Sequence, residues 1–223
     1  MIDLESVAHG YTGAELFSEV SLRLGGGSFH FLTGPSGAGK TTLLRLCYGE
    51  LVPQRGKITF FGENRRGMAR DKLAFTRQRI GVVHQDCQFL DHLTLRENVA
   101  LPLIAGQRPV PDTDLDELLS WVGLSAHADA LPPTLSGGER QRAALARAII
   151  TSPEVLLADE PTGNLDWEMS TRLLQLMIEL NRMGTAVLIA THDLNLIRAA
   201  KPHVSARVLR IAGRKLQLAG ADL

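Results

Sequence analysis

The sequence predicts an α/β fold with a mostly parallel central sheet, an antiparallel β edge and an α-helical subdomain. Strand and helix patterns alternate around a glycine-rich loop at residues 34–42, which is typical of a parallel sheet with helices on both faces. Two short apolar runs, Glu154–Ala158 and Thr185–Ala190, have the composition of central strands buried on both sides. Between Asp86 and Ile150 the strand pattern stops and helical segments dominate, so we assign this stretch to the helical subdomain.

The remaining strands are expected where apolar residues alternate with polar ones or lie between glycines. In chain order they are Ile2–Val7, Val20–Leu24, Ser28–Thr33, Gly56–Gly62 and Ile80–His84, followed by a terminal hairpin, Ala206–Ile211 and Lys215–Leu218, around Gly213-Arg214. Tyr11 is expected on a glycine-flanked loop after the first strand.

Helices are expected at Thr42–Tyr48 and, with one apolar face, at Met169–Met183. Thr113 with Asp116 resembles a capping box that opens a helix ending at Gly123. The basic stretch Arg65–Arg79 permits a helix, and we interpret its charges as a solvated face.

Bulk composition is that of a globular protein. The chain has 223 residues, 44% of them hydrophobic, and its 24 Lys and Arg balance 24 Asp and Glu, so net charge gives no argument for nucleic acid as a partner. No apolar run approaches the ~18 residues of a membrane span, and the N-terminus lacks a signal-peptide pattern, so we expect a soluble cytosolic protein. Cys47 and Cys87 are the only cysteines and are expected to be free thiols.

The glycine-rich stretch fits the phosphate-binding loop G-x-x-x-x-G-K-[ST]. Glycines allow backbone N–H groups to close on a polyphosphate, and the helix that follows directs its dipole at the anion. Lys40 would reach the β- and γ-phosphates, and Thr41 would be a ligand of Mg²⁺. A plain glycine-rich turn is the alternative, but the full motif lies between a strand and a helix, so we expect a nucleoside triphosphate to bind here. The loop residues are Gly34, Pro35, Ser36, Gly37, Ala38, Gly39, Lys40, Thr41 and Thr42.

Polar residues follow the other parallel strands at the edge where ligands collect. Asp159 would hold Mg²⁺, and Glu160 would orient or deprotonate the attacking water. Gln85 would contact both the metal's water and the γ-phosphate region, which adds it to Thr41 and Asp159 as a metal-site residue. His192 could donate a hydrogen bond to the γ-phosphate. Alone, a glutamine or histidine would more often be structural.

Ser136-Gly137-Gly138 would begin a helix in the same manner as the first loop, with an N-cap hydroxyl and bare N–H groups. An ordinary capped surface helix is the alternative. If both helix starts serve one nucleotide, the second comes from another copy of the chain. This predicts a symmetric homodimer with two ATP molecules at its interface.

Taken together, these motifs resemble those of ABC-transporter ATPase subunits, in the same order along nearly the whole chain. Gly34–Thr42, Gln85, Leu135–Gln141, Val155–Glu160, Gly163–Asp166 and His192 match the Walker A, Q-loop, signature, Walker B, D-loop and H-loop motifs. The resemblance implies an ABC-type P-loop NTPase that hydrolyses ATP to ADP and phosphate with Mg²⁺. It also implies that Tyr11 stacks on adenine and that Asp166 belongs to the ATP site, while Gln85, Glu160 and His192 act in catalysis.

The resemblance implies one ABC ATPase domain, residues 1–223, in two parts. Residues 1–85 and 151–223 would form a RecA-like core with an N-terminal β-subdomain, and residues 86–150 the helical signature subdomain. ABC subunits of this kind work with an integral membrane subunit. We expect it to dock beside Gln85, at Asp86–Ile104. The apolar side chains expected there are Phe89, Leu90, Leu93, Leu95 and Val99.

A narrower likeness is to the FtsE branch of this family, the ATPases of bacterial cell division. Phe31–Lys40, Gln85-Asp86, Glu97–Leu103, Ala158–Asp166 and Ala190–Ile197 carry it. It implies an FtsX-like membrane partner, control of periplasmic cell-wall hydrolases, contact with other division proteins, and a peripheral place on the cytoplasmic side of the inner membrane at the septum. His84 stands where these families commonly have an aromatic residue, which removes no catalytic group.

Other functions remain open at this point. The ATPases of lipoprotein-release and macrolide-efflux exporters share the Asp159–Asp166 block but usually have a serine at the position of Ala38. A soluble ATPase acting on DNA would carry long insertions between Gln85 and the signature, where this chain has about fifty residues. A nucleotide-responsive scaffold with negligible hydrolysis is the third alternative.

Overall fold

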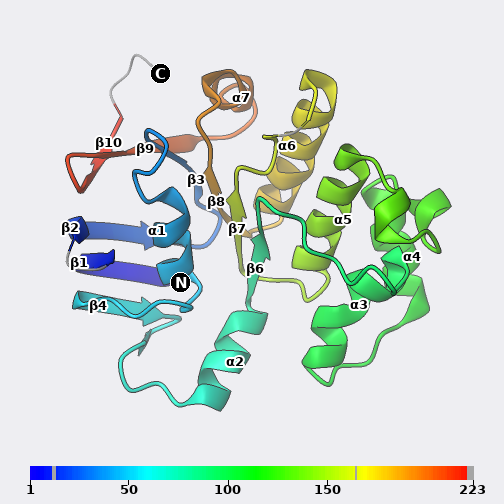
Figure 1. Cartoon of the computed structure of the whole chain (residues 1–223), viewed down its shortest axis with the longest axis horizontal. Helices are drawn as coiled ribbons and strands as arrows, with labels where there is room; N and C mark the ends of the chain where they lie inside the picture. The colour runs from blue at the N-terminus through cyan, green and yellow to red at the C-terminus, as the bar shows by residue number, and fades with distance from the viewer. Residues whose placement is uncertain (12–13, 164, 220–223) are drawn as a thin grey trace.

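The computed structural model describes residues 1–11, 14–163 and 165–219, and these form two sheets with helices around them (Figure 1). The four-stranded sheet has the order β2-β1-β4-β5 and the six-stranded sheet the order β10-β9-β3-β8-β7-β6. The strands are β1 (Ile2–Tyr11), β2 (Ala14–Leu24), β3 (Phe29–Thr33), β4 (Arg55–Phe60), β5 (Glu63–Asn64), β6 (Ile80–Val83), β7 (Val155–Asp159), β8 (Ala186–Ala190), β9 (Ala206–Ala212) and β10 (Lys215–Leu218).

The six-stranded sheet positions the site. β6, β7, β8, β3 and β9 pair in parallel, and only β10 is antiparallel, in the hairpin expected at the end of the chain. The carboxyl ends of the parallel strands therefore lie at one edge, where the glycine-rich loop follows β3 and Gln85 follows β6. All five residues of both β7 and β8 are buried. Their side chains enter a different core on each face, which is why their sequences are continuously apolar.

The helices complete two cores. They are α1 (Lys40–Cys47), α2 (Arg70–Gln78), α3 (Leu95–Ala105), α4 (Asp112–Trp121), α5 (Gly137–Ile149), α6 (Trp167–Arg182) and α7 (Leu194–Ala200), with short 3₁₀ turns at Ser125–His127 and Pro132–Thr134. One apolar cluster lies between the six-stranded sheet and α3 to α7, and the other lies between the two sheets and around α1. In Figure 1, α3, α4 and α5 gather on the side away from the four-stranded sheet.

Close packing explains one glycine outside the loop. A Cβ at Gly81 of β6 would lie 2.3 Å from the backbone oxygen of Ala148 in α5, so only glycine lets this helix approach the strand. Among the described residues, no helix is both long and apolar enough to cross a bilayer.

Two local predictions are wrong. Tyr11 is the last residue of β1 and does not lie on a loop, because β1 continues past register shifts between Leu4 and Val7 and between Val7 and Gly10. The capping box at Thr113 does not form: α4 begins at Asp112, two residues earlier than that box requires, its N-cap is Pro111, and no side chain caps it. Pro111 has an extended backbone, which allows the helix to begin directly after it.

Candidate active site

A cavity of about 750 Å³ opens at the carboxyl edge of the six-stranded sheet. The loop after β3, the residues after β6, β7 and β8, and the ends of β1 and β2 enclose it. Its lining consists of Tyr11, Leu16, Gly34, Pro35, Ser36, Gly37, Gly39, Lys40, Thr41, Thr42, Gln85, Asp159, Glu160, Gly163 and His192. The segments that follow four parallel strands thus meet at the edge that the topology predicts, and Tyr11 and Leu16 of the four-stranded sheet also line the cavity.

The glycine-rich loop leaves the start of α1 open. Gly39 has a φ of 100°, and a Cβ there would lie 2.6 Å from the ring of Phe17, so glycine is required on both backbone and packing grounds. No side chain caps the first N–H groups of α1, and its first turn holds no acidic residue. Open N–H groups at the positive end of a helix dipole form an anion site.

Lys40 lies over this loop. Its Nζ donates a hydrogen bond of 3.1 Å to the backbone oxygen of Gly34 and lies 3.4 Å from Oε1 of Glu160. Both side chains are about nine-tenths buried, with 11% exposure each. The ammonium group therefore stands between the loop and the carboxylate, where screening by water is weak.

Glu160 is held in one orientation from three sides. Its Oε2 lies 3.0 Å from Nδ1 of His192 and accepts the backbone N–H of His192 at 3.4 Å, while Oε1 faces Lys40. The backbone of Glu160 has a φ of 45°, which is uncommon for a residue with a side chain, and its N–H donates to the oxygen of Ala190 in β8. A carboxylate fixed in this way is suited to orient or deprotonate a water molecule.

Asp159 has a different environment, although it is adjacent in sequence. It ends β7 with 6% exposure, and burial raises the pKa of its carboxyl group above the ordinary range, while the neighbouring Thr41 hydroxyl works against this rise. Its Oδ1 is buried and has no hydrogen-bond partner within the described part of the chain. A buried carboxylate oxygen without a donor is uncommon unless an ion or water completes it.

These residues fit Mg²⁺. The ion prefers oxygen ligands and is usually held by one or two carboxylates together with hydroxyl, water and phosphate oxygens. The orphaned Oδ1 of Asp159, the Thr41 hydroxyl and the Gln85 amide line the same cavity. No cluster of three or more His, Cys, Asp or Glu suited to a metal occurs in residues 1–11, 14–163 and 165–219, so a site built only from such ligands is absent there.

Tyr11 stands at the rim of the cavity. Its side chain is 45% exposed, and its hydroxyl lies 3.4 Å from the Thr42 hydroxyl, which ties the end of β1 to α1. An exposed aromatic ring at the mouth of a phosphate site can stack on a nucleobase.

The second predicted anion site lies elsewhere. Ser136 caps α5 through a reciprocal capping box: Glu139 N–H donates to the Ser136 hydroxyl, and Ser136 N–H donates to Oε2 of Glu139 at 2.7 Å. Gly138 packs against α6, where a Cβ would lie 3.1 Å from Cε of Met169. None of Ser136, Gly137 and Gly138 lines the 750 Å³ cavity.

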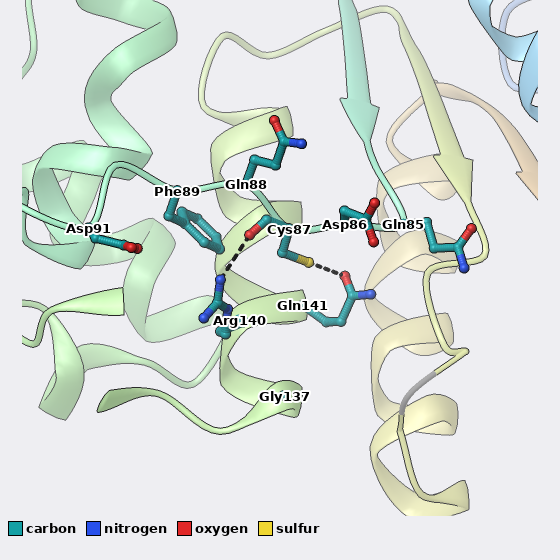
Figure 2. Close-up of a pocket in the computed structure, with 9 residues that line it drawn as sticks. All are labelled: Gln85, Asp86, Cys87, Gln88, Phe89, Asp91, Gly137, Arg140 and Gln141. Carbon is teal, nitrogen blue, oxygen red and sulfur yellow. Dashed lines mark hydrogen bonds between the residues drawn. The ribbon is translucent and has the colours of Figure 1, made fainter. Parts of the chain in front are cut away.

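A separate cavity of about 600 Å³ lies between the start of α5 and the segment after Gln85 (Figure 2). The Cys87 thiol donates to Oε1 of Gln141 at 2.8 Å, and Nη2 of Arg140 donates to the Cys87 backbone oxygen at 3.2 Å. Arg147 donates to the backbone oxygen of Gln88 at 2.6 Å. One face of α5 is therefore joined to the segment that carries Gln85.

Residues 17–163 match the ABC transporter family. The chain belongs to this family. It is 46% identical over 202 residues to the cell division ATP-binding protein FtsE of Haemophilus influenzae, covering 89% of this chain and 93% of that protein. It is 44% identical over 200 residues to FtsE of Escherichia coli K12, covering 88% and 90%. The chain is thus an FtsE-like ATP-binding protein, as the motif blocks predicted.

A solved structure supports the fold assignment. The dimeric ATP-binding cassette MJ0796, in a post-hydrolysis state bound to ADP and phosphate, superposes with a TM-score of 0.86 at 30% identity and covers 97% of both chains. The predicted α/β fold of the ABC ATPase type is confirmed by this likeness and by the mixed sheets of the structure.

The cavity of this ABC transporter family member brings together most, but not all, of the predicted site residues. Ala38 lies in the loop but outside the lining, and Asp166 caps α6 by accepting the N–H of Met169 at 2.8 Å. Sequence reasoning missed Leu16 and Gly163 as lining residues, and it missed the contacts of Cys87 and Arg147. A single residue in β2 or a thiol beside Gln85 carries no motif, so only the register and packing reveal these positions.

Proposed function

We propose that this chain is a Mg²⁺-dependent ATPase that hydrolyses ATP to ADP and phosphate in the 750 Å³ cavity. The observation that carries the proposal is the convergence of Lys40, Asp159 and Glu160 on the uncapped start of α1. The loop N–H groups and Lys40 bind the β- and γ-phosphates, and Tyr11 stacks on adenine. Thr41, Gln85 and Asp159 hold the Mg²⁺, which offsets the charge of the phosphates.

Hydrolysis then depends on the orientation of Glu160. Its carboxylate, fixed by the side chain and the backbone N–H of His192, accepts a proton from the attacking water or aligns it for attack on the γ-phosphate. Bound phosphate competes with Glu160 for the ammonium of Lys40, since Lys40 lies within 3.4 Å of that carboxylate. This exchange frees the carboxylate from its counter-ion and strengthens it as a base.

The working unit is a homodimer with two ATP molecules at its interface. Ser136, Gly137 and Gly138 lie outside the cavity of their own chain, so they reach a nucleotide only across a pairing of two copies. Asp166, which caps α6 beside them, joins the same interface. The dimeric state of MJ0796, whose fold matches this chain over 97% of its length, supports this arrangement.

The proposed membrane partner is an FtsX-like integral subunit, which follows from the similarity to FtsE. The predicted docking groove is wrong at Leu95 and Val99, because both side chains are fully buried in the core and cannot line a groove. A cleft of about 490 Å³ between α2, β6, α3 and α5 lies close by, lined among others by Ala74, Val82 and Pro102. Exposed Phe75 and Ile104 belong to the same two helices, α2 and α3. We place the partner's cytosolic segment in this cleft.

In the cell, closure of the dimer would then control periplasmic cell-wall hydrolases through the partner, with the chain on the cytoplasmic face of the inner membrane at the septum. The alternative is the ATPase of a lipoprotein-release or macrolide-type exporter.

Two experiments separate these functions. Phosphate release by the purified protein, with and without Mg²⁺, tests hydrolysis, and a rate equal to that of Glu160→Gln would favour a nucleotide-responsive scaffold. Depletion of this protein in its native cell tests whether it acts in cell division or in export. Filaments with unsplit septa support cell division, whereas lipoproteins retained in the inner membrane support an exporter.

A further inference from the structure

Another cavity, of about 360 Å³, lies at the opposite edge of the six-stranded sheet from the active site. His30 belongs to β3 and Ser28 directly precedes that strand, Ser205 precedes β9, and Arg23 belongs to β2. The phosphate loop begins at Gly34, at the other end of β3. At about 3.3 Å per residue, His30 and Gly34, which line different cavities, lie about 13 Å apart along that strand.

Two buried polar atoms in this cavity have no partner. His30 is 3% exposed, and its Nδ1 is buried without a hydrogen bond within the described part of the chain. The hydroxyl oxygen of Ser28, two residues earlier and on the same lining, is also buried and unpartnered there. Most buried side-chain polar atoms in proteins are hydrogen-bonded, so two unpartnered atoms in residues that line one cavity indicate a missing ligand or water.

The charge of the cavity selects an anion. Arg207 is the direct neighbour of His30 in the β3–β9 ladder, and Arg23 approaches from the other sheet. Neither arginine forms an ion pair with a described residue, and no acidic side chain is among the residues lining the cavity. Asp3 of β1 is the ladder partner of Arg23, whereas the β3 partner of Arg207 is His30. The two guanidinium groups, with the Ser28 hydroxyl and the His30 imidazole, match the donors that proteins use for phosphate.

Burial and the charge of Arg207 lower the pKa of His30, so its imidazole is neutral at neutral pH. The arginines would supply the charge, and Ser28 and His30 would supply directional hydrogen bonds. A single water could satisfy both orphaned atoms but would not balance the charge of Arg207. The cavity also exceeds the ~30 Å³ that one water occupies.

We infer that this chain binds a small free oxyanion of the phosphate class between Arg23, Ser28, His30 and Arg207, at a site separate from the nucleotide cavity. This inference is independent of the proposed ATPase function, since none of these residues lines the active site.

The test uses the full chain saturated with Mg²⁺ and ADP, so that the nucleotide cavity is filled. Inorganic phosphate is titrated at constant ionic strength with chloride, and the His30 imidazole is followed by NMR of histidine-labelled protein. We expect a saturable shift of the His30 signal with a dissociation constant of about 1 mM or below. Absence of a saturable shift up to about 30 mM phosphate would overturn the proposal.

Two variants make the test specific. Arg207→Gln is expected to weaken phosphate binding by about tenfold or more, because it removes one charge-assisted contact. Arg210→Gln, on the same strand but outside the cavity, is the matched control and should leave binding unchanged. Equal binding by wild type and Arg207→Gln would contradict the assignment. Acetate, which is planar and carries one charge, should bind several-fold more weakly, and equal affinity for acetate would overturn the phosphate class.

Discussion

The starts of α1 and α5 both offer backbone N–H groups to an anion, but the start of α1 is uncapped whereas the start of α5 is capped by its own side chains. Both helices begin after a glycine-rich or serine-glycine turn and direct N–H groups outward. α1 begins after Gly39 without a side-chain cap, and Lys40 adds a positive charge. α5 is capped by Ser136, and the Glu139 carboxylate already lies 2.7 Å from both the backbone N–H and the hydroxyl of that serine.

This difference indicates that the two helix starts have different roles in nucleotide binding. The hydrogen bonds from Ser136 hold the pKa of Glu139 below its usual range, so this carboxylate is ionised beside the helix start. A phosphate approaching α5 must compete with that carboxylate for the Ser136 hydroxyl, whereas a phosphate approaching α1 meets open N–H groups. We therefore expect α1 to bind nucleotide by itself and α5 to contribute only when a second protomer presents a bound triphosphate.

The largest effect is expected at α1. Lys40→Ala should weaken ATP binding about a thousandfold, because it removes the charge that faces the β- and γ-phosphates. Calorimetric titration with ATP and Mg²⁺ measures this loss. Lys57→Ala, an exposed lysine on β4, is the control and should bind normally. Tight binding by Lys40→Ala would refute the phosphate-loop assignment.

The next largest effect is a loss of ATP hydrolysis with ATP binding retained. Glu160→Gln should slow turnover on the order of a hundredfold or more while ATP binding is retained, since the amide keeps the shape of the side chain but cannot accept a proton. Single-turnover phosphate release and ATP affinity should be measured on the same preparation. Turnover equal to that of the wild type would exclude Glu160 as the group that acts on water.

At α5 we expect a smaller and different effect. Ser136→Ala should lower turnover about tenfold without changing the affinity of the monomer for ATP, because the nucleotide it contacts belongs to the partner. Thr94→Ala is the matched control: Thr94 and Glu97 form the same capping box at α3, outside the site. That variant should lose about 1 kcal/mol of unfolding free energy but keep its turnover. If Ser136→Ala weakened ATP binding by the monomer, the contrast between the two helix starts would fail.

The smallest effect is on stability. The pKa of Asp159 is raised in the folded protein, so the folded state holds this proton more tightly, and the resulting stabilisation is lost as pH rises through that pKa. Asp159→Asn should therefore raise the unfolding free energy of the metal-free protein at neutral pH by about 1 kcal/mol, and by less in mild acid. Denaturant unfolding at both pH values measures the difference. The variant should also lose stabilisation by Mg²⁺, and a full Mg²⁺ response would contradict the role of Asp159.

Patterns with strong local causes could be predicted from the sequence. The phosphate loop is fixed by glycines whose φ values require them, and β7 and β8 by apolar runs too short for helices. The strand-end rule then predicted that Gln85, Glu160 and His192 would line one cavity, which the topology explains.

Features that depend on the length of a side chain or on its packing in the core could not be predicted from the sequence. A capping box forms at Thr94 and not at Thr113, because the longer Glu97 side chain reaches back to the N-cap N–H at 2.7 Å, whereas Asp116 pairs with Arg96. The apolar residues Leu95 and Val99 were assigned to a docking groove, but the same helical spacing also fits a face packed on the core, and the structure places them there. Sequence periodicity alone does not distinguish these two environments.

The central claim is that each triphosphate is bound between the start of α1 in one protomer and the start of α5 in the partner protomer. It is tested most directly by mixing two inactive variants, Lys40→Ala and Ser136→Glu. In a mixed dimer of this kind one site carries both defects and the other carries neither. The shared-site account predicts recovery to about a quarter of the wild-type ATPase rate, since half of randomly formed dimers are mixed and each has one intact site. A mixture no more active than the average of its two components would contradict it.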